Sequence, residues 1–358
     1  MGSNSNTFKP VQESLLESGG KVPKRYIKEK EEEEVIEDIP DLVLKNDLII
    51  DLSLLSSSFP NELEKLRSTL TSWGYVHVIN HGMSCSFLDQ VRDVITQFFT
   101  LPTHLKEPYF IKDNQAPTDA PLNGYGSDNA YKQVILNWND NMHLQLYPPT
   151  KHNFEKWPSI PESFRSTLHE YTMKTKMIID EVLKAMACSL KLEEESFFKL
   201  WGNDENDIIL GRFNYYPRCP MADKVHGLKP HGDGSAITIV LQDKYVDGLQ
   251  MFKDDKWFKV PIIPGAVLFI VGDQMEIMSN GIFKSPTHKV VPHSQFDRTS
   301  LAMFCIPSPK KEIGPLKRLI NKDRPQLYKN LKDYAQIFFQ SYPENDKDRK
   351  IHDVKLRY

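Results

Sequence analysis

The spacing of hydrophobic residues changes near residue 200, and the change predicts two regions of different structure. Before it, apolar residues recur every three or four positions, as Leu63, Leu66 and Leu70 do ahead of Gly74. That spacing is typical of amphipathic helices. We therefore expect helices over three stretches of this region, 60–73, 84–99 and 161–190. Two shorter apolar stretches, 47–55 and 75–79, predict strands beside them.

After residue 205, short apolar runs alternate with turns rich in Gly, Pro and Asp. Examples are "AITIVLQD" (236–243), "GAVLFIVGD" (265–273) and "RTSLAMFCIPSP" (298–309). Short strands with such punctuation indicate an antiparallel sandwich or barrel. A helical pattern returns near the end of the chain and predicts a closing helix at 324–342.

The first residues are polar and then strongly charged, and the run from Lys28 to Asp38 is typical of a solvated helix face or a flexible segment. We divide the chain accordingly. The expected parts are a polar extension, a mostly helical region, a β-rich core and a helical C-terminal segment, over 1–45, 46–200, 201–310 and 311–358.

Composition narrows the possible partners and the compartment. The 358 residues carry 45 basic and 48 acidic side chains, a net charge of -3, which does not favour binding to nucleic acid or to a membrane surface. The four cysteines form no CxxC pair and are typical of reduced thiols. No apolar stretch reaches the roughly 20 residues of a membrane helix, and the N-terminus has no signal-peptide core. We expect a soluble, monomeric, cytoplasmic protein with a small-molecule partner.

One stretch carries candidate metal ligands. In "KPHGDGSAITIVLQD", His231 and Asp233 are two residues apart and would share one face of a strand. We expect Ile237 and Ile239 to continue that face and to line the site with hydrocarbon. Taken alone the pair is a weak signal, because a buried histidine with a hydrogen-bond partner is the commoner outcome.

A second histidine strengthens the metal interpretation. His288 stands at the head of another β-branched run, in "SPTHKVV". Two imidazoles and one carboxylate form a facial triad that leaves three positions of an octahedral ion open, which suits Fe(II). Structural zinc prefers closed sites with thiolates, and no cysteine here has the spacing to complete one.

Arg298 and Ser300 are also two residues apart, in "RTS". A planar guanidinium binds a carboxylate with two parallel hydrogen bonds, and a nearby hydroxyl adds a third. The pair is therefore a candidate site for the far carboxylate of a keto acid bound to iron. Without the triad, an exposed strand end would be the preferred interpretation.

These residues and their order resemble the plant 2-oxoglutarate- and Fe(II)-dependent dioxygenases, over about residues 48 to 340. The matching motifs include "WGYVHVINHG", "NYYPRCP", "HGD", "GLQ" and "RTS". The resemblance implies a mainly β fold with flanking helices (α+β). Its core would be a distorted double-stranded β-helix, or jelly roll, over 201–310.

The resemblance also implies roles for individual residues. His231, Asp233 and His288 would hold Fe(II). Arg298 and Ser300 would bind 2-oxoglutarate, with Tyr216 as a further hydrogen-bond donor and Asn214 beside the site, whereas Tyr215 would be a packing residue. O2 would be the second cosubstrate and ascorbate would support activity.

The implied reaction converts 2-oxoglutarate to succinate and CO2 while a substrate carbon is hydroxylated. If that carbon is an O-methyl or N-methyl group, the product loses formaldehyde. The resemblance points to plant specialised metabolites (flavonoids, alkaloids or terpenoid-like molecules). It locates three residues near the substrate: Arg212, Phe304 and either Met142 or His143. Alternation along its strand puts Phe304 on the face of Arg298 and Ser300.

Two alternatives stay open. One is an iron oxidase of the same fold that does not use 2-oxoglutarate, and the other is a non-catalytic receptor for a small molecule. The chain departs from the family pattern at Gly232, where Thr or Ser is more frequent, and at Lys289, where Arg is common. Neither is an expected ligand, and the sequence alone does not explain the small residue at 232.

Overall fold

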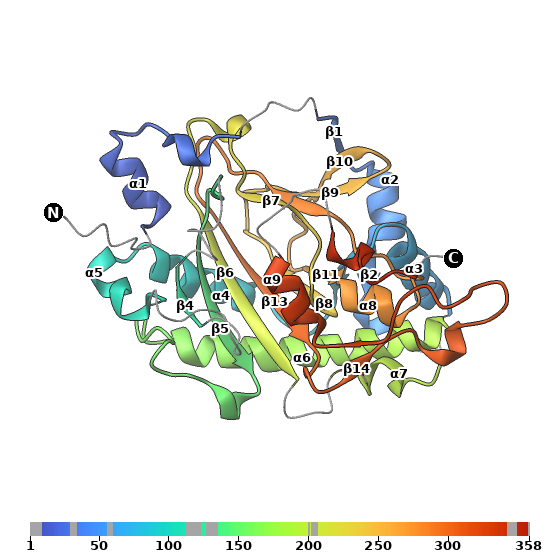
Figure 1. Ribbon diagram of the computed structural model, residues 1–358. Helices are drawn as coiled ribbons and strands as arrows, with labels where there is room; N and C mark the ends of the chain where they lie inside the picture. Colours follow the sequence, from blue (N-terminus) through green and yellow to red (C-terminus); the bar gives the residue numbers. More distant parts are fainter. Residues whose placement is uncertain are drawn as a thin grey trace.

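A computed structural model describes residues 9–28, 34–55, 60–111, 123–126, 135–199, 201, 207–341 and 349–356. Within these residues, two main sheets face each other, one with five strands and one with eight (Figure 1). In spatial order the smaller sheet contains β1 (Ile36–Asp38), β10 (Lys256–Lys259), β9 (Leu249–Lys253), β12 (His288–Val290) and β7 (Leu228–His231). The larger contains β2 (Ile49–Asp51), β3 (Tyr75–Ile79), β11 (Val267–Val271), β8 (Ile237–Leu241), β13 (Arg298–Ile306), β6 (Ile208–Tyr216), β5 (Asp140–Tyr147) and β4 (Gly124–Tyr125).

The chain crosses repeatedly between the two sheets. It runs from β7 in the smaller sheet to β8 in the larger, back to β9 and β10, and then through β11, β12 and β13 on alternating sides. This winding is the double-stranded β-helix, so the predicted jelly-roll core is confirmed. Because consecutive strands lie in opposite sheets, side chains from both sheets meet between them.

Two hydrophobic clusters occupy the two faces of the larger sheet. The cluster between the sheets includes Val240 and Leu268 from the larger sheet and Leu249 and Val290 from the smaller. The second, larger cluster packs the opposite face of the larger sheet against helices. Because neighbouring residues of a strand point to opposite faces, each position of β6, β8 or β13 belongs either to the jelly-roll interior or to the helix side.

Helices cover the outer face of the larger sheet, and the longest, α6, runs along it (Figure 1). The predicted helices are confirmed as α3 (Pro60–Ser72), α4 (Cys85–Phe99) and α6 (Phe164–Ser189). Ser84 caps α4, since its hydroxyl accepts a hydrogen bond from Phe87 N at 3.2 Å. Shorter helices are α1 (Val11–Glu17), α2 (Asp41–Val43), α5 (Thr103–Lys106), α7 (Glu195–Phe198), α8 (Asp273–Met278) and α9 (Tyr334–Ser341). None of the helices within the described ranges is both long and apolar enough to cross a membrane.

The closing helix is shorter than the sequence predicts. Of the described residues 324–341, only those of α9 are helical, because Leu331 and Lys332 form β15, which pairs with β14 (Glu312–Ile313). Asp333 then adopts a φ of 51°, in the left-handed region, and a right-handed helix cannot extend back through it. The prediction of one continuous helix was therefore wrong over its first half.

The described parts of the first 45 residues pack against the rest of the protein. Val11 N, at the start of α1, donates a hydrogen bond of 2.6 Å to Asp140 Oδ1 in β5. Strand β1 pairs in parallel with β10. Residues 29–33 of the charged run lie outside the described residues. This N-terminal region thus adds a strand to the smaller sheet and a helix beside β5.

Candidate active site

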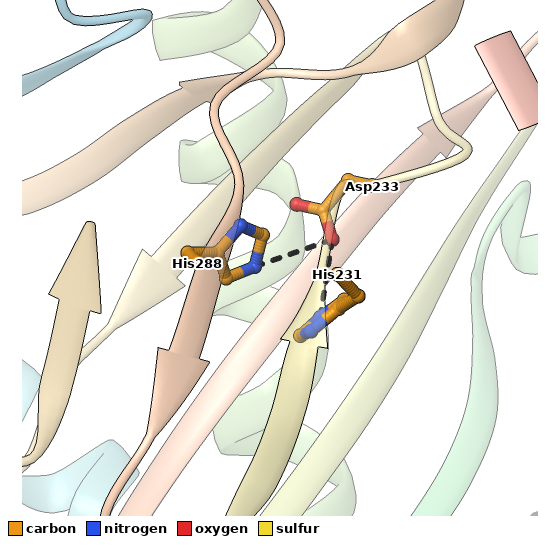
Figure 2. A group of neighbouring side chains, drawn as sticks. All are labelled: His231, Asp233 and His288. Atoms are coloured by element: carbon orange, nitrogen blue, oxygen red, sulfur yellow. Dashed lines mark ion pairs between the residues drawn. The ribbon is translucent and has the colours of Figure 1, made fainter. Parts of the chain in front are cut away.

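Three side chains from adjacent segments converge between the sheets (Figure 2). His231 ends β7 and His288 begins β12, and the two residues are direct partners in the antiparallel pairing of these strands. Asp233 lies on the turn after β7. Its Oδ1 atom is 3.8 Å from His231 Nε2 and 3.6 Å from His288 Nε2. The ligand atoms of the three residues all lie within 4.8 Å of one another, the arrangement that three ligands of a single ion require.

Hydrogen bonds orient both imidazoles. His231 Nδ1 is 2.7 Å from Lys229 O, and His288 Nδ1 is 3.2 Å from Pro286 O. A carbonyl oxygen only accepts, so each Nδ1 carries a proton, and each ring turns its Nε2 atom toward the site as the candidate ligand atom. Burial, and then the proximity of His288, hold the pKa of His231 well below its usual value. Asp233 Oδ2 is buried without a hydrogen-bond partner among the described residues. Two imidazoles with inward-facing Nε2 atoms and a carboxylate oxygen with no partner among the described residues fit an Fe(II) ion with open coordination positions.

The turn between the ligands differs from the expected strand. The structure ends β7 at His231 and begins β8 at Ile237 in the other sheet, so His231 and Asp233 do not share a strand face. Backbone hydrogen bonds hold the turn instead: Asp273 N donates to Asp233 O at 2.7 Å, and Gln274 N donates to Ser235 O at 3.1 Å. Ile237 and Ile239 pack in the helix-side cluster. The prediction that they line the site was wrong, and Val240 lies in the interior cluster instead.

The four candidate cosubstrate residues lie together on two paired strands. Arg298 of β13 is opposite Tyr216 of β6, and Ser300 is opposite Asn214. The Arg298 side chain is only 1 % exposed, yet its Nε and Nη1 atoms have no hydrogen-bond partner among the described residues. Leaving buried charged donors unsatisfied is costly. The guanidinium therefore has the bonding capacity that a bound carboxylate would use.

The side chains of Arg298, Tyr216, Asn214 and Ser300 also contact one another. The Arg298 guanidinium carbon lies 5.2 Å from the centre of the Tyr216 ring. Asn214 Nδ2 donates to Ser300 Oγ at 3.4 Å. Burial raises the pKa of the Tyr216 phenol, which Arg298 and Arg212 partly offset, so the hydroxyl stays protonated and can donate a hydrogen bond.

The candidate substrate residues separate onto two faces. His143 of β5 is opposite Arg212 of β6, which is opposite Ala302 of β13, so these residues share the interior face with Arg298 and Ser300. Phe304 is on the same face of β13 and half-buried, as strand alternation predicts. Met142 points the other way. It pairs with Phe213 and lies fully buried in the helix-side cluster, so its assignment to the substrate pocket was wrong.

Comparisons with known proteins agree with this geometry. Residues 210–307 match the profile of the 2OG-Fe(II) oxygenase superfamily, and residues 49–161 match that of the non-haem dioxygenase in morphine synthesis N-terminal family. The chain is 31% identical to Jasmonate-induced oxygenase 4 of Arabidopsis thaliana over 339 residues, covering 92% of this chain and 93% of the relative. The chain belongs to the 2OG-Fe(II) oxygenase superfamily.

A further relative and a solved structure are similar to the chain over almost its whole length. The chain is 33% identical to a flavonol synthase/flavanone 3-hydroxylase of Eustoma exaltatum subsp. russellianum over 328 residues, 90% of this chain and 95% of the relative. The crystal structure of JOX2 in complex with 2OG, Fe and JA superposes with a TM-score of 0.85 at 30% identity, covering 98% of this chain and 99% of that one. This oxygenase is accordingly an Fe(II)- and 2-oxoglutarate-dependent dioxygenase, and the family disfavours the alternative of a non-catalytic receptor.

Sequence reasoning missed several polar residues around the oxygenase site. Asn139 Nδ2 donates to Asn214 Oδ1 at 3.0 Å, while Asn139 Oδ1 and Asn141 Oδ1 are buried without a partner among the described residues. It also missed Arg349, whose guanidinium lies against Gly232. The "NWNDNMH" stretch, rich in amides ahead of His143, could have indicated the asparagines; nothing local to Arg349 indicated its position.

Proposed function

We propose that this dioxygenase hydroxylates or oxidatively demethylates a plant specialised metabolite, with His231, Asp233 and His288 as the Fe(II) ligands. The observation that carries the proposal is the convergence of two inward-facing Nε2 atoms and one carboxylate within 4.8 Å. Bound there, Fe(II) supplies the oxidation of a substrate carbon by O2, coupled to conversion of 2-oxoglutarate to succinate and CO2.

In this proposal the chain's own residues determine how the cosubstrate lies. Arg298 binds the carboxylate of 2-oxoglutarate that is remote from the metal, through the Nε and Nη1 donors, which have no partner within the described ranges. Ser300 and Tyr216 add hydroxyl donors beside it. Because β13 and β6 hold these groups in register, Arg298, Ser300 and Tyr216 would hold the carboxylate of the cosubstrate in one orientation.

The substrate is proposed to lie along β5, β6 and β13, against His143, Arg212 and Phe304. Arg212 lies on the interior face of the larger sheet, between His143 of β5 and Ala302 of β13. A buried cation and an aromatic ring together suit a small molecule with a flat or apolar body and an acidic or hydrogen-bond-accepting oxygen. The names of the relatives, among them jasmonate-induced oxygenases and a flavonol synthase, support a substrate of this class.

Succinate formation tests the reaction. The full-length protein, supplied with Fe(II), labelled 2-oxoglutarate and a panel of flavonoids, alkaloids and terpenoid acids, should form one succinate for each substrate that gains an oxygen or loses a methylene group. Product formation without succinate would instead favour the iron oxidase that does not use 2-oxoglutarate.

That the protein is monomeric and cytoplasmic stays a prediction. Light scattering would test the oligomeric state, and the localisation of a tagged protein would test the compartment.

Replacing a ligand tests the metal assignment. His231→Ala should abolish binding of Co(II), used as a spectroscopic substitute for Fe(II), and should abolish turnover. The exposed His104 offers a matched control, and His104→Ala should leave both unchanged. Co(II) binding at wild-type affinity in His231→Ala would remove this residue from the proposed ligand set.

A further inference from the structure

The guanidinium of Arg349 connects the two segments that carry the candidate metal ligands. Its Nη1 donates to Ser285 O at 2.7 Å, and its Nη2 donates to Ser285 Oγ at 2.7 Å and to Asp273 Oδ1 at 2.5 Å. Ser285 is three residues before His288. Asp273 N in turn donates to Asp233 O at 2.7 Å. One side chain thus links the approach to His288 with the turn that carries Asp233.

The same guanidinium lies directly on Gly232, between His231 and Asp233. A Cβ atom added at Gly232 would lie 2.8 Å from both Cζ and Nε of Arg349, which is closer than real Cβ contacts. The arginine could not move aside freely, because its three hydrogen bonds to Asp273 and Ser285 would break. Arg349 therefore fills the space that a side chain at position 232 would need.

Packing and backbone hydrogen bonds hold residues 349–356, the segment that contains Arg349, against the rest of the protein. Ile351 is 1 % exposed, and Val354 belongs to the same buried cluster. Leu356 N donates to Leu327 O at 2.9 Å, and Lys329 N donates to Val354 O at 3.0 Å. These contacts bind the C-terminal residues to the protein independently of the arginine. The guanidinium is thereby held in place over the ligand turn.

The negative charge of Asp273 balances the positive charge of Arg349; the two residues and their hydrogen bonds are called the bridge below. Asp273, 1 % exposed, accepts from Arg349 on one oxygen and from Tyr334 OH on the other at 2.8 Å. Because the carboxylate offsets the guanidinium, the bridge adds little net positive charge beside a site suited to a divalent cation. A lone arginine at this place would repel that cation.

We propose that Arg349 is a positioning residue of the iron site, which sets the geometry of the His231–Asp233 turn relative to His288. The proposal rests on the function proposed above, in which these three residues are the ligands. Groups that orient metal ligands typically change metal affinity or activity by about 10- to 100-fold when they are removed. Arg349 differs from most such groups because it acts on the backbone between two ligands and not on a ligand side chain.

Co(II) titration of the metal-free, full-length protein tests the proposal. Arg349→Ala should weaken Co(II) binding by roughly 10- to 100-fold and change the visible absorption of bound Co(II), which reports ligand geometry. The neighbouring Lys350 pairs with Asp353 at 3.3 Å on the surface, and Lys350→Ala is the matched control with expected wild-type affinity and spectrum. Wild-type affinity and spectrum in Arg349→Ala would overturn the proposal.

A substitution at Gly232 supplies a test that general destabilisation does not mimic. Gly232→Ser should weaken Co(II) binding in the wild-type background, because its side chain displaces the guanidinium. In an Arg349→Ala background the same substitution should have little further effect or restore affinity, because the space is then open. An equal loss in both backgrounds would show that the two residues act independently and would contradict the proposal.

Two further measurements keep the outcomes separate. If Arg349→Ala does not fold, Arg349→Lys can replace it. A lysine ammonium can keep the ion pair with Asp273, but it has no second nitrogen to donate to Ser285 O and no planar group to cover Gly232. Its Co(II) affinity should still fall, and an unchanged affinity counts against the role. His231→Ala serves as the reference in each titration. Loss of binding in His231→Ala with wild-type binding in Arg349→Ala would retain the ligand assignment and reject only the positioning role.

Discussion

Replacing Arg298 by lysine should raise the requirement for 2-oxoglutarate while leaving the fold intact. The guanidinium is 1 % exposed, and its Nε and Nη1 atoms form no hydrogen bond within the described residues. Lysine keeps the positive charge but has no planar pair of donors. A carboxylate that bridges two guanidinium nitrogens would keep only one strong hydrogen bond after the substitution.

The size of the effect follows from that single lost bond. A hydrogen bond to a charged group contributes about 1.5–3 kcal/mol. Since every 1.4 kcal/mol changes an equilibrium constant about tenfold, the apparent KM for 2-oxoglutarate should rise roughly 10- to 100-fold. The free energy of unfolding should change much less, because Nε and Nη1 of Arg298 have no partner to lose in the part of the chain that the structure describes. Affinity for the metal should not change, because Arg298 is not a proposed ligand.

Succinate formation at saturating Fe(II) and substrate, with 2-oxoglutarate varied, measures the effect. Arg318 pairs with Glu193 at 3.0 Å on an exposed surface, so Arg318→Lys is the control and should retain the wild-type KM. Thermal unfolding of both variants separates a binding defect from a folding defect. An unchanged KM in a folded Arg298→Lys protein would refute the assignment of this arginine to the cosubstrate carboxylate.

Further predictions follow from burial. Met142→Ala should lower the free energy of unfolding by about 2–5 kcal/mol in urea titrations, because a fully buried side chain is lost from the core. His143→Ala should instead mainly raise the KM for the substrate. The reverse pattern would contradict the strand register. Burial raises the pKa of Asp140 from 3.8 to about 6, so its contribution to stability is present below the unfolded pKa and is lost as pH rises through 6. Asp140→Asn should therefore gain stability relative to wild type between pH 4 and pH 6.5, by up to ~3 kcal/mol at about 1.4 kcal/mol per pKa unit; a pH-independent difference would argue against a buried charge there.

The metal ligands could be predicted because their chemistry depends on residue type and order. His231, Asp233 and His288 are the ligand types of a facial triad, and each stands where an apolar run begins or ends. The reasoning about strand geometry was nevertheless wrong. The run "ITIVL" is buried at every position, so its hydrophobicity contains no alternation that could reveal where the strand begins or which face is interior.

The same limit explains the substrate residues. Seven of the eight residues of β5 are buried, so burial alone does not distinguish Met142 from His143. Only the pairing with β6 decides, since His143 is opposite Arg212 and Met142 is opposite Phe213. Phe304 could be predicted because it lies on the same strand as Arg298, and alternation within one unbroken strand needs no knowledge of the partner strand.

Gly232 shows a different limit, because the reason for a small residue can lie far away in the chain. Local sequence suggests a flexible turn, but Gly232 has no left-handed φ that would require glycine. Arg349 occupies the space that a side chain at Gly232 would need. The ring of Phe338 does the same at Gly234, where an added Cβ would lie 2.8 Å from Phe338 Cδ2. Both glycines of "HGDG" therefore admit side chains of the C-terminal segment onto the ligand turn. A small residue beside a metal ligand is better interpreted as a contact whose partner must be found than as a source of flexibility.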